Sequence, residues 1–294
     1  MPRIAYVNGR YVPHAEASVH IEDRGFQFAD GVYEVVTVVG GRTADEEGHL
    51  RRLGRSLGEL RIDWPVPPHA LGLLMREVIR RNGLRNGLLY IQVTRGVAPR
   101  DFKFPAGARS SLVMTARPTK FQSQAQVGGG VPVITTPDIR WLRRDIKSVA
   151  LLPQVLAKQK AVEAGAFEAW MLDPDGTVTE GSSSNAWIVT KDGVLVTRPP
   201  SNLILNGITR LTLLRCAAAL GIKVEERPFT LEEALAAKEA FVSSASTFCL
   251  PVTSIDGKPV GNGHPGLVTQ RLRAAYMEDQ GIADPVPVAG PVPA

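Results

Sequence analysis

β-branched and alternating apolar positions near the start of the chain predict paired strands. Residues 4–7 and 10–12 flank the dipeptide Asn8-Gly9, which strongly favours a two-residue hairpin turn. Residues 32–39 are rich in β-branched residues, and two consecutive glycines follow them as a second turn signal. The first 45 residues are therefore expected to begin a β-sheet.

Two helices and two further strands are expected next. Leucines recur at spacings of three and four between residues 50 and 60, which places one apolar stripe along a helix. A second helix is predicted over about 69–81, because its pattern stops near Asn82-Gly83. Residues 88–94 and 112–116 return to a strand pattern and are expected to join the same sheet.

The rest of the chain predicts a second, larger domain. Residues 117–130 are polar, contain a proline and end in three glycines, which is typical of a linker. Strands are expected beyond them at 132–136, 169–172, 177–179, 186–190 and 194–197. Helices are expected at about 148–165, 209–220, 231–237 and 265–278. The sequence thus predicts an α+β protein with a small α/β domain (1–119), a linker (120–130), a large domain (131–282) and a disordered proline-rich tail (283–294).

Composition excludes several classes of protein. The chain has 294 residues, 44% hydrophobic and 21% charged, as in an ordinary globular protein. No stretch reaches the roughly 18 apolar residues of a membrane-spanning helix, and the first residues have no apolar signal core. Cys216 and Cys249 are too few for a disulfide framework or a zinc cluster, so we expect a cytoplasmic protein without a metal. The net charge is +5, but the basic residues are scattered, so we expect no nucleic-acid or membrane partner.

The segment D-I-R-W-L-R-R-D-I-K-S at 138–148 carries the first candidate group, Lys147. It ends a mostly strand-like run and precedes an expected helix, with Arg140, Arg143 and Arg144 close to it in the chain. A lysine that burial and neighbouring cations keep unprotonated can form a Schiff base with an aldehyde. A solvated basic surface fits the same residues, so this segment alone leaves both interpretations open.

The segment T-V-T-E-G-S-S-S-N at 177–185 carries a candidate carboxylate, Glu180. A carboxylate at the end of a strand can pair with a protonated ring nitrogen and keep a pyridinium charged. The three serines that follow offer hydroxyl and backbone donors, although the residues around Ser183 do not match the G-x-S-x-G elbow of serine hydrolases. A plain hairpin loop is the alternative.

Two loops suggest phosphate binding. L-N-G-I-T-R at 205–210 leads into an expected helix, whose first free amides form a natural phosphate site, and S-S-A-S-T at 243–247 offers further amides and hydroxyls. A simple helix cap and a polar loop are the alternatives. Together, a lysine, a carboxylate, an arginine and two such loops are the groups that bind pyridoxal phosphate.

These segments resemble the class IV (fold-type IV) pyridoxal-phosphate aminotransferases, most of all the branch that acts on D-amino acids. Further matches are R-G-F-Q-F-A-D-G-V-Y-E at 24–34, H-L-R-R-L at 49–53, Y-I-Q-V-T-R-G at 90–96 and L-A-K-Q at 156–159. All occur in family order between about residues 4 and 277. The resemblance implies a homodimer whose subunits have a small N-terminal α/β domain and a larger pseudo-barrel α/β domain.

The resemblance also implies a role for individual residues. Lys147 would be the Schiff-base lysine and proton carrier, Glu180 the partner of the ring nitrogen, and Leu205 the apolar platform beneath the ring. The phosphate would be held by Arg52, Ile208, Thr209, Ser246 and the backbone amide of Ala245. The substrate pocket would include Tyr33, Arg100 and Ser183. In the family, the loop that carries this arginine reaches across from the partner subunit.

One departure concerns the substrate. The D-specific pattern has Arg-x-His in that loop, whereas this chain has Arg100-Asp101-Phe102. We predict a transaminase that moves the amino group of D-amino acids such as D-alanine or D-glutamate to 2-oxo acids such as 2-oxoglutarate. A branched-chain L-amino acid aminotransferase and an aminodeoxychorismate lyase share the fold and are the alternatives. A basic binding module without catalysis is the alternative from a different class.

Overall fold

The computed structural model describes residues 3–282, so the predicted proline-rich tail at 283–294 lies outside the described residues. The chain divides into two compact units. Unit 1 contains the residues up to Lys120 together with Ile146–Leu151. Unit 2 contains Phe121–Asp145 and the residues from Leu152 onward. Lys147 therefore belongs to unit 1, although most of its sequence motif lies in unit 2.

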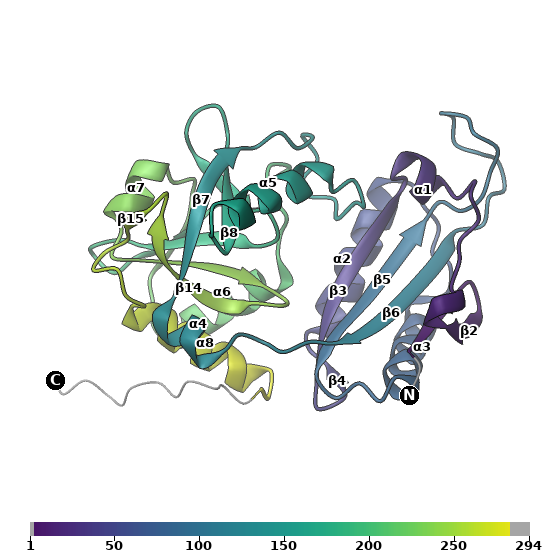
Figure 1. The fold of residues 1–294 in the computed structure, drawn as a ribbon, viewed down its shortest axis with the longest axis horizontal. Coiled ribbons are helices and arrows are strands. Elements are labelled where there is room, and N and C mark those ends of the chain that lie inside the picture. The colour runs from purple at the N-terminus through teal and green to yellow at the C-terminus, as the bar shows by residue number, and fades with distance from the viewer. Residues whose placement is uncertain (1–2, 283–294) are drawn as a thin grey trace. The chain divides into compact units, whose positions relative to one another are not determined.

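Unit 1 is built on one antiparallel sheet of six strands (Figure 1). Its strands pair in the order β2-β1-β6-β5-β3-β4, with bounds β1 (Ile4–Val7), β2 (Arg10–Pro13), β3 (Gly31–Val39), β4 (Arg42–Thr43), β5 (Gly87–Thr94) and β6 (Ser111–Pro118). The predicted first hairpin is confirmed: Asn8 and Gly9 have φ angles of 46° and 91°, as a primed two-residue turn requires.

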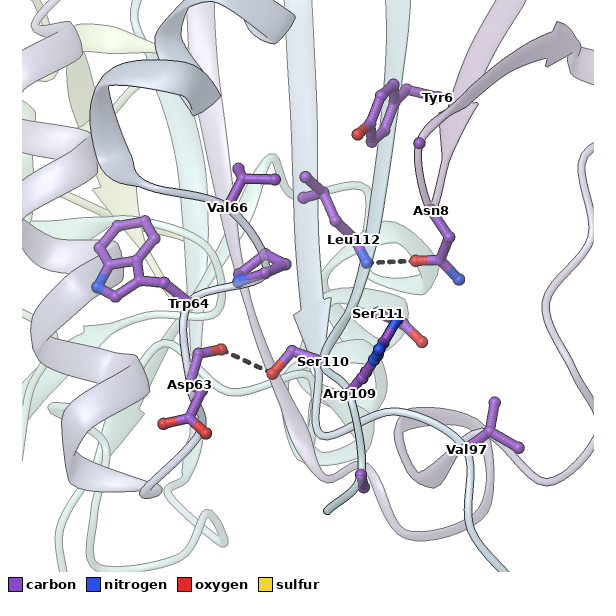
Figure 2. Close-up of a pocket in the computed structure, with 13 residues that line it drawn as sticks. Tyr6, Asn8, Asp63, Trp64, Val66, Val97, Arg109, Ser110, Ser111 and Leu112 are labelled. Carbon is purple, nitrogen blue, oxygen red and sulfur yellow. Dashed lines mark hydrogen bonds between the residues drawn. The ribbon is translucent and has the colours of Figure 1, made fainter.

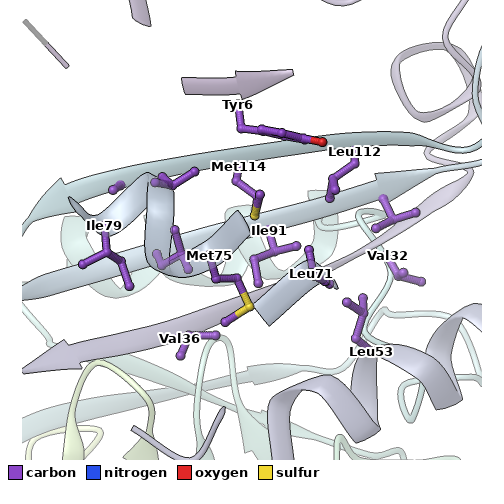
Figure 3. Packing of buried hydrophobic residues seen from close by; sticks show 14 of the residues in the cluster. Tyr6, Val32, Val36, Leu53, Leu71, Met75, Ile79, Ile91, Leu112 and Met114 are labelled. Atoms are coloured by element: carbon purple, nitrogen blue, oxygen red, sulfur yellow. The ribbon is translucent and has the colours of Figure 1, made fainter. Parts of the chain in front are cut away.

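Two helices cover the sheet of unit 1, and two short elements precede β3. α2 (Glu46–Glu59) and α3 (Pro68–Arg81) confirm the predicted helices, while η1 (His14–Glu16) and α1 (Arg24–Phe28) were not predicted. Figure 3 shows Leu71, Met75 and Ile79 of α3 packed against the strand residues Ile91 and Met114. The apolar face of α3 thus forms the core of unit 1 with one side of the sheet.

Unit 2 has a mixed sheet of nine strands. Its main path runs β12-β11-β10-β13-β14-β7-β8-β9, and β15 pairs with β14. The strands are β7 (Val131–Pro137), β8 (Glu168–Leu172), β9 (Val178–Gly181), β10 (Asn185–Val189), β11 (Leu195–Thr197), β12 (Val224–Glu226), β13 (Glu239–Ser244), β14 (Phe248–Ile255) and β15 (Lys258–Pro259). The pairings β11–β12, β14–β7 and β7–β8 are parallel, and the others are antiparallel.

The sheet of unit 2 must curl strongly. β9 is one edge strand and β10 lies near the opposite edge, yet only residues 182–184 connect them. The four Cα–Cα steps from Gly181 to Asn185 span at most about 14 Å, so β9 lies close to β10 and the sheet curls back on itself. This curled half-barrel agrees with the predicted pseudo-barrel.

The described part of unit 2, up to residue 282, contains five helices: α4 (Gln124–Gly129), α5 (Leu152–Glu163), α6 (Ile208–Ala219), α7 (Leu231–Ala236) and α8 (Leu267–Asp279). α4 falls inside the segment that we expected to be a linker, where Ser123 and Gln126 form a capping box. α5 begins later than predicted. The helix cannot start at residue 148, because Tyr33 and Val149 use backbone hydrogen bonds to attach residues 147–149 to β3. Pro153 then fixes the first turn of α5.

Candidate active site

Lys147 is held within unit 1 by β3 and α2. Its carbonyl accepts a hydrogen bond from the Tyr33 amide at 2.9 Å, and its own amide donates to the Ser56 hydroxyl at 3.3 Å. The side-chain Nζ lies 3.2 Å from the Tyr33 hydroxyl and 4.3 Å from the centre of the Tyr33 ring. Tyr33 in turn stacks on Tyr90 at 5.7 Å, and burial raises the pKa of Tyr90 to about 12. The lysine amine therefore has a fixed direction, set by a phenol that is itself packed.

The three arginines of the same motif bind carboxylates of unit 2. The strand-like run expected before Lys147 was wrong, because residues 138–145 form no regular element. Arg140 pairs with Asp138 at 2.6 Å and also with Glu180. Arg144 pairs with Asp173 at 2.8 Å, and Arg143 with Asp145 at 3.0 Å. Since each guanidinium has a carboxylate partner, these residues organise the acidic groups of unit 2.

Glu180 is a buried acid at the end of β9. It accepts hydrogen bonds from the Arg140 guanidinium, from the Asn185 side-chain amide at 3.1 Å and from the Leu205 backbone amide at 3.2 Å. Burial raises the pKa of Glu180 above its ordinary value, although Arg140 and the Leu205 amide act in the opposite direction. A cationic ring nitrogen beside this group would favour its ionised form.

Asn185, which was not singled out from the sequence, connects the predicted cofactor residues of unit 2. Its side-chain amide donates to Glu180 and to the Leu205 carbonyl at 2.9 Å. A Cβ on Gly207 would clash with the Asn185 side-chain oxygen, so the loop before α6 comes as close as glycine permits. Asn185 also pairs in the sheet with Ser243, the first residue of the second predicted phosphate loop. An asparagine at the start of a strand, where strand propensity disfavours it, was the available signal.

Two amide-rich turns lie at the predicted phosphate-binding positions. α6 begins at Ile208, and its N-cap Gly207 makes no side-chain cap hydrogen bond, so Ile208 and Thr209 stand in a helical first turn without a side-chain cap. Both residues are buried. In the other turn, the Ser244 hydroxyl pairs with the hydroxyls of Ser246 at 3.3 Å and Thr247 at 2.8 Å. Ala245 lies between these hydroxyl groups in the chain.

Arg52 belongs to a buried cluster in unit 1. Its guanidinium donates to both carboxylate oxygens of Glu34, at 2.8 and 2.7 Å, and His49 Nδ1 lies 2.7 Å from the same carboxylate. Burial alone would raise the pKa of Glu34, but Arg52 and His49 outweigh it and lower that pKa to about 2. Glu34 thus fixes the orientation of Arg52.

Ser183 belongs to a serine triplet that surrounds one buried acid, Glu168. The Ser183 and Ser184 hydroxyls donate to Glu168 at 2.8 and 3.0 Å, and Ser182 also donates to it. The Ser183 backbone amide points at the same carboxylate at 3.3 Å. The hydroxyl groups that the sequence suggested as donors to a ligand therefore donate to Glu168 in this structure.

Arg100 lies in the loop between β5 and β6 and stacks on Phe28 of α1, with its guanidinium carbon 4.6 Å from the ring centre. Phe102 contacts the same ring at 5.5 Å and is 83% exposed.

A separate pocket of about 700 Å³ lies in unit 1, at the base of that loop. Figure 2 shows its apolar side chains Trp64, Val66 and Leu112 near Asn8 and Ser110. None of the predicted site residues lines this pocket. Among residues 3–282, no cluster of metal-binding side chains occurs, and no helix is both long and apolar enough to cross a membrane.

Comparison with known proteins identifies the family. The family model of class IV amino-transferases matches residues 31–255. The D-alanine aminotransferase of Bacillus licheniformis is 44% identical over 270 residues, covering 92% of this chain and 94% of that protein. That of Listeria monocytogenes serotype 4b is 43% identical over 276 residues, covering 93% and 94%. The crystal structure of the branched-chain amino acid aminotransferase of Escherichia coli superimposes with a TM-score of 0.88 at 26% identity, covering 95% of each chain.

The curled sheet of unit 2 and these similarities show a fold-type IV enzyme. The chain belongs to the class IV aminotransferases, whose cofactor is pyridoxal phosphate. The described residues fit this cofactor, since unit 2 brings a buried acid and a helix start without a side-chain cap together around Asn185.

Proposed function

We propose that this enzyme transfers the amino group of D-amino acids, such as D-alanine or D-glutamate, to 2-oxo acids such as 2-oxoglutarate. The similarity to the two D-alanine aminotransferases carries this proposal, because it extends over more than nine-tenths of the chain at 43–44% identity. The similarity to the Escherichia coli branched-chain enzyme is as complete in fold but only 26% in sequence.

Each predicted cofactor residue has a role under this proposal. Glu180 holds the ring nitrogen, with Arg140 and Asn185 fixing its carboxylate. Leu205 would form the apolar platform for the ring. The phosphate is bound by the first turn of α6 and by the turn after β13, through Ile208, Thr209, Ala245 and Ser246, with Arg52 as the cationic partner. The fixed backbone around Asn185 supports this arrangement, because it joins the two turns of unit 2 to Glu180.

Lys147 would hold the cofactor through its aldehyde carbon, and once the substrate amine has replaced it there, its freed amine would carry the proton of the reaction. When bound, the cofactor supplies an electron-withdrawing ring that stabilises negative charge at the substrate Cα. Glu180 maintains the proton on the ring nitrogen. The freed Nζ of Lys147 would take up the proton from the substrate Cα and pass it to the cofactor, and Tyr33 orients Nζ through the contact at 3.2 Å.

The substrate side of the proposal rests on Arg100, Tyr33 and Ser183. Arg100 binds the α-carboxylate of the amino acid, because a planar guanidinium matches a carboxylate in shape and charge. Tyr33 lines the pocket beside Lys147, and Ser183 belongs to the loop that Glu168 fixes.

The test is a donor panel with the purified enzyme, pyridoxal phosphate and saturating 2-oxoglutarate. D-alanine should bleach the visible cofactor band and yield pyruvate, whereas L-valine and L-leucine should react far more slowly. A branched-chain L-amino acid aminotransferase is the second candidate, favoured by the TM-score of 0.88. Faster turnover of L-valine than of D-alanine would establish that candidate and overturn the D-specific assignment.

A homodimer is part of this proposal, and α5 supports it. α5 directs the small residues Ala157 and Ala161 into unit 2. Its large aliphatic side chains point to solvent instead, with exposures of 68% for Leu152, 58% for Val155 and 59% for Val162. A helix that exposes its large aliphatic side chains is typical of a protein–protein interface. A second copy of the chain is the proposed partner. Light scattering should give twice the chain mass, and Val155→Asp should produce monomers.

The cytoplasm is the proposed location. Cys216 and Cys249, both buried, are the chain's two cysteines, too few for the disulfide framework of an exported protein, which suits a reducing compartment.

A further inference from the structure

The loop that carries Arg100 is anchored to the segment around α1. The Arg24 amide donates to the Gly96 carbonyl at 2.9 Å, and the Ala98 amide donates to the Glu22 carbonyl at 3.3 Å. The Arg24 guanidinium donates to the Asp101 carbonyl at 2.6 Å, one residue beyond Arg100. The backbone on either side of Arg100 is therefore fixed relative to α1.

The ring of Phe28, at the end of α1, is the contact point for the side chains of this loop. The guanidinium carbons of Arg24 and Arg100 lie 4.7 and 4.6 Å from its centre, and the Phe102 ring lies 5.5 Å away. Arg24 is buried and forms an ion pair with Asp30 at 2.8 Å. Arg100 differs, because within residues 3–282 it has neither a hydrogen bond nor an ion pair.

A guanidinium that stacks on an aromatic ring keeps its N–H groups in its own plane, where they remain available to a planar acceptor. Stacking also restricts the long arginine side chain before a ligand arrives, which reduces the entropy lost on binding. The ligand chemistry that suits such a group is a carboxylate bound through two parallel hydrogen bonds.

Phe28 is itself held rigidly. Asp23 caps α1 by accepting from the Gly25 amide at 2.8 Å, and its other oxygen accepts from the Thr94 hydroxyl at 2.9 Å. α1 ends immediately after Phe28, at Ala29, which has a left-handed φ of 55°. A Cβ on Gly25 would clash with the Thr94 side chain, so α1 lies directly against β5. The backbone that carries the Phe28 ring is therefore fixed against β5.

We propose that Phe28 is the positioning residue for Arg100: by stacking, it presents the Arg100 guanidinium to the α-carboxylate of the substrate. This inference rests on the proposed function, which gives Arg100 its ligand. Through Arg100, Phe28 sets the affinity for every amino acid and 2-oxo acid that carries an α-carboxylate, without itself contacting the substrate.

The experiment compares Phe28→Leu, Phe28→Tyr, Arg100→Ala and the double variant Phe28→Leu/Arg100→Ala in the holoenzyme with D-alanine. Loss of a cation–π contact should weaken substrate binding by about 2- to 30-fold. Phe28→Leu should raise KM for D-alanine within that range while kcat changes little, and Phe28→Tyr should restore the wild-type KM. The double variant should behave like Arg100→Ala, because Phe28 acts through Arg100.

Phe104→Leu is the matched control. Phe104 lies in the same loop as Arg100 but stacks on other arginines, Arg95 at 3.7 Å and Arg61 at 4.7 Å. It should leave KM near the wild-type value. An equal increase in KM for Phe104→Leu would overturn the proposal, because the effect would then come from loop order in general. Additive effects in the double variant would also overturn it.

Two outcomes separate this inference from the proposed function. A neutral Arg100→Ala would remove the carboxylate role of Arg100, whereas a damaging Arg100→Ala with a neutral Phe28→Leu would remove only the role of Phe28. If Phe28→Leu does not fold, 3,4,5-trifluorophenylalanine at position 28 weakens the cation–π contact while keeping the shape of the ring. An unchanged KM in that protein would refute the proposal, and an increase would support it.

Discussion

Arg140 and Glu180 form an ion pair inside unit 2, and Asn185 binds the same carboxylate from the next strand. The acid is thus held by a cation and an amide, and burial raises its pKa. Both partners fix its direction, so a cofactor ring nitrogen would meet a preformed acceptor.

Glu180→Gln tests this acceptor. The amide preserves the shape of the side chain but cannot hold the ring nitrogen protonated, so the enzyme should bind cofactor nearly normally and turn over at least about 100-fold more slowly. Single-turnover kinetics with D-alanine would measure the loss. Glu232→Gln, an exposed glutamate on α7, is the control. Turnover near the wild-type rate would mean that another group serves the ring nitrogen.

Lys147→Ala should remove the visible band of the bound cofactor and reduce transamination by many orders of magnitude. No other group in this site is expected to supply both the covalent attachment and the proton transfer. Absorption spectroscopy and a pyruvate assay would measure the two effects. Lys191→Ala, in an exposed turn, should change neither. A retained band would show that a different lysine binds the cofactor.

Thr209→Val should weaken retention of the cofactor without changing stereochemistry. The substitution keeps the size of this buried side chain in the first turn of α6 but removes its hydroxyl, and one hydrogen bond to a charged group contributes about 1.5–3 kcal/mol. The dissociation constant of pyridoxal phosphate from the apoenzyme should therefore rise about 10- to 150-fold. Equal retention after dialysis would place the phosphate elsewhere.

Glu34 should make the stability of the protein depend on acid pH. Its pKa falls from 4.5 to about 2 on folding, so it stabilises the folded state above pH 4.5, and this contribution disappears as the pH falls towards 2. The shift corresponds to about 3 kcal/mol. Urea unfolding should give a much larger free energy of unfolding for the wild type than for Glu34→Gln at pH 7. This difference should shrink below pH 4.5. A difference in the free energy of unfolding that stays constant with pH would contradict this account.

The sequence predicted the elements with strong local patterns and missed those that depend on tertiary context. The Asn8-Gly9 hairpin and the helices of unit 1 have turn and periodicity signals that act locally. β14 was missed because Pro251 interrupts a strand pattern, although β14 lies inside the sheet and carries an irregularity just beyond that proline.

The candidate site shows the same division. Motif resemblance could name Lys147, Glu180 and Tyr33, but it could not show which side chains contact one another. Tyr33 is 114 positions from Lys147 along the chain, and Asn185 contacts Leu205 across 20 positions. The role of Glu168 as the acceptor for three serine hydroxyls likewise depends on the pairing of β8 with β9, which brings residues 14 to 16 positions apart into contact.

Phe102→His tests the departure in the Arg100 loop. Phe102 is 83% exposed and contacts Phe28, so an imidazole at this position can keep an aromatic contact while offering an N–H donor to the substrate carboxylate. Hydrogen bonds to charged groups contribute about 1.5–3 kcal/mol, so kcat/KM for D-alanine should rise by about 10- to 150-fold.

D-amino acids with apolar side chains, such as D-leucine, are the comparison substrates for Phe102→His. If Phe102 contributes apolar contact, Phe102→His should gain less with D-leucine than with D-alanine, and Phe102→Leu should retain the D-leucine rate without gaining activity towards D-alanine. The measurement is kcat/KM for each D-amino acid with 2-oxoglutarate saturating, near pH 8, where the imidazole is neutral and still carries one N–H donor. An unchanged or lower kcat/KM for D-alanine in Phe102→His would mean that position 102 does not reach the substrate carboxylate, and that Arg100 alone binds it from this loop.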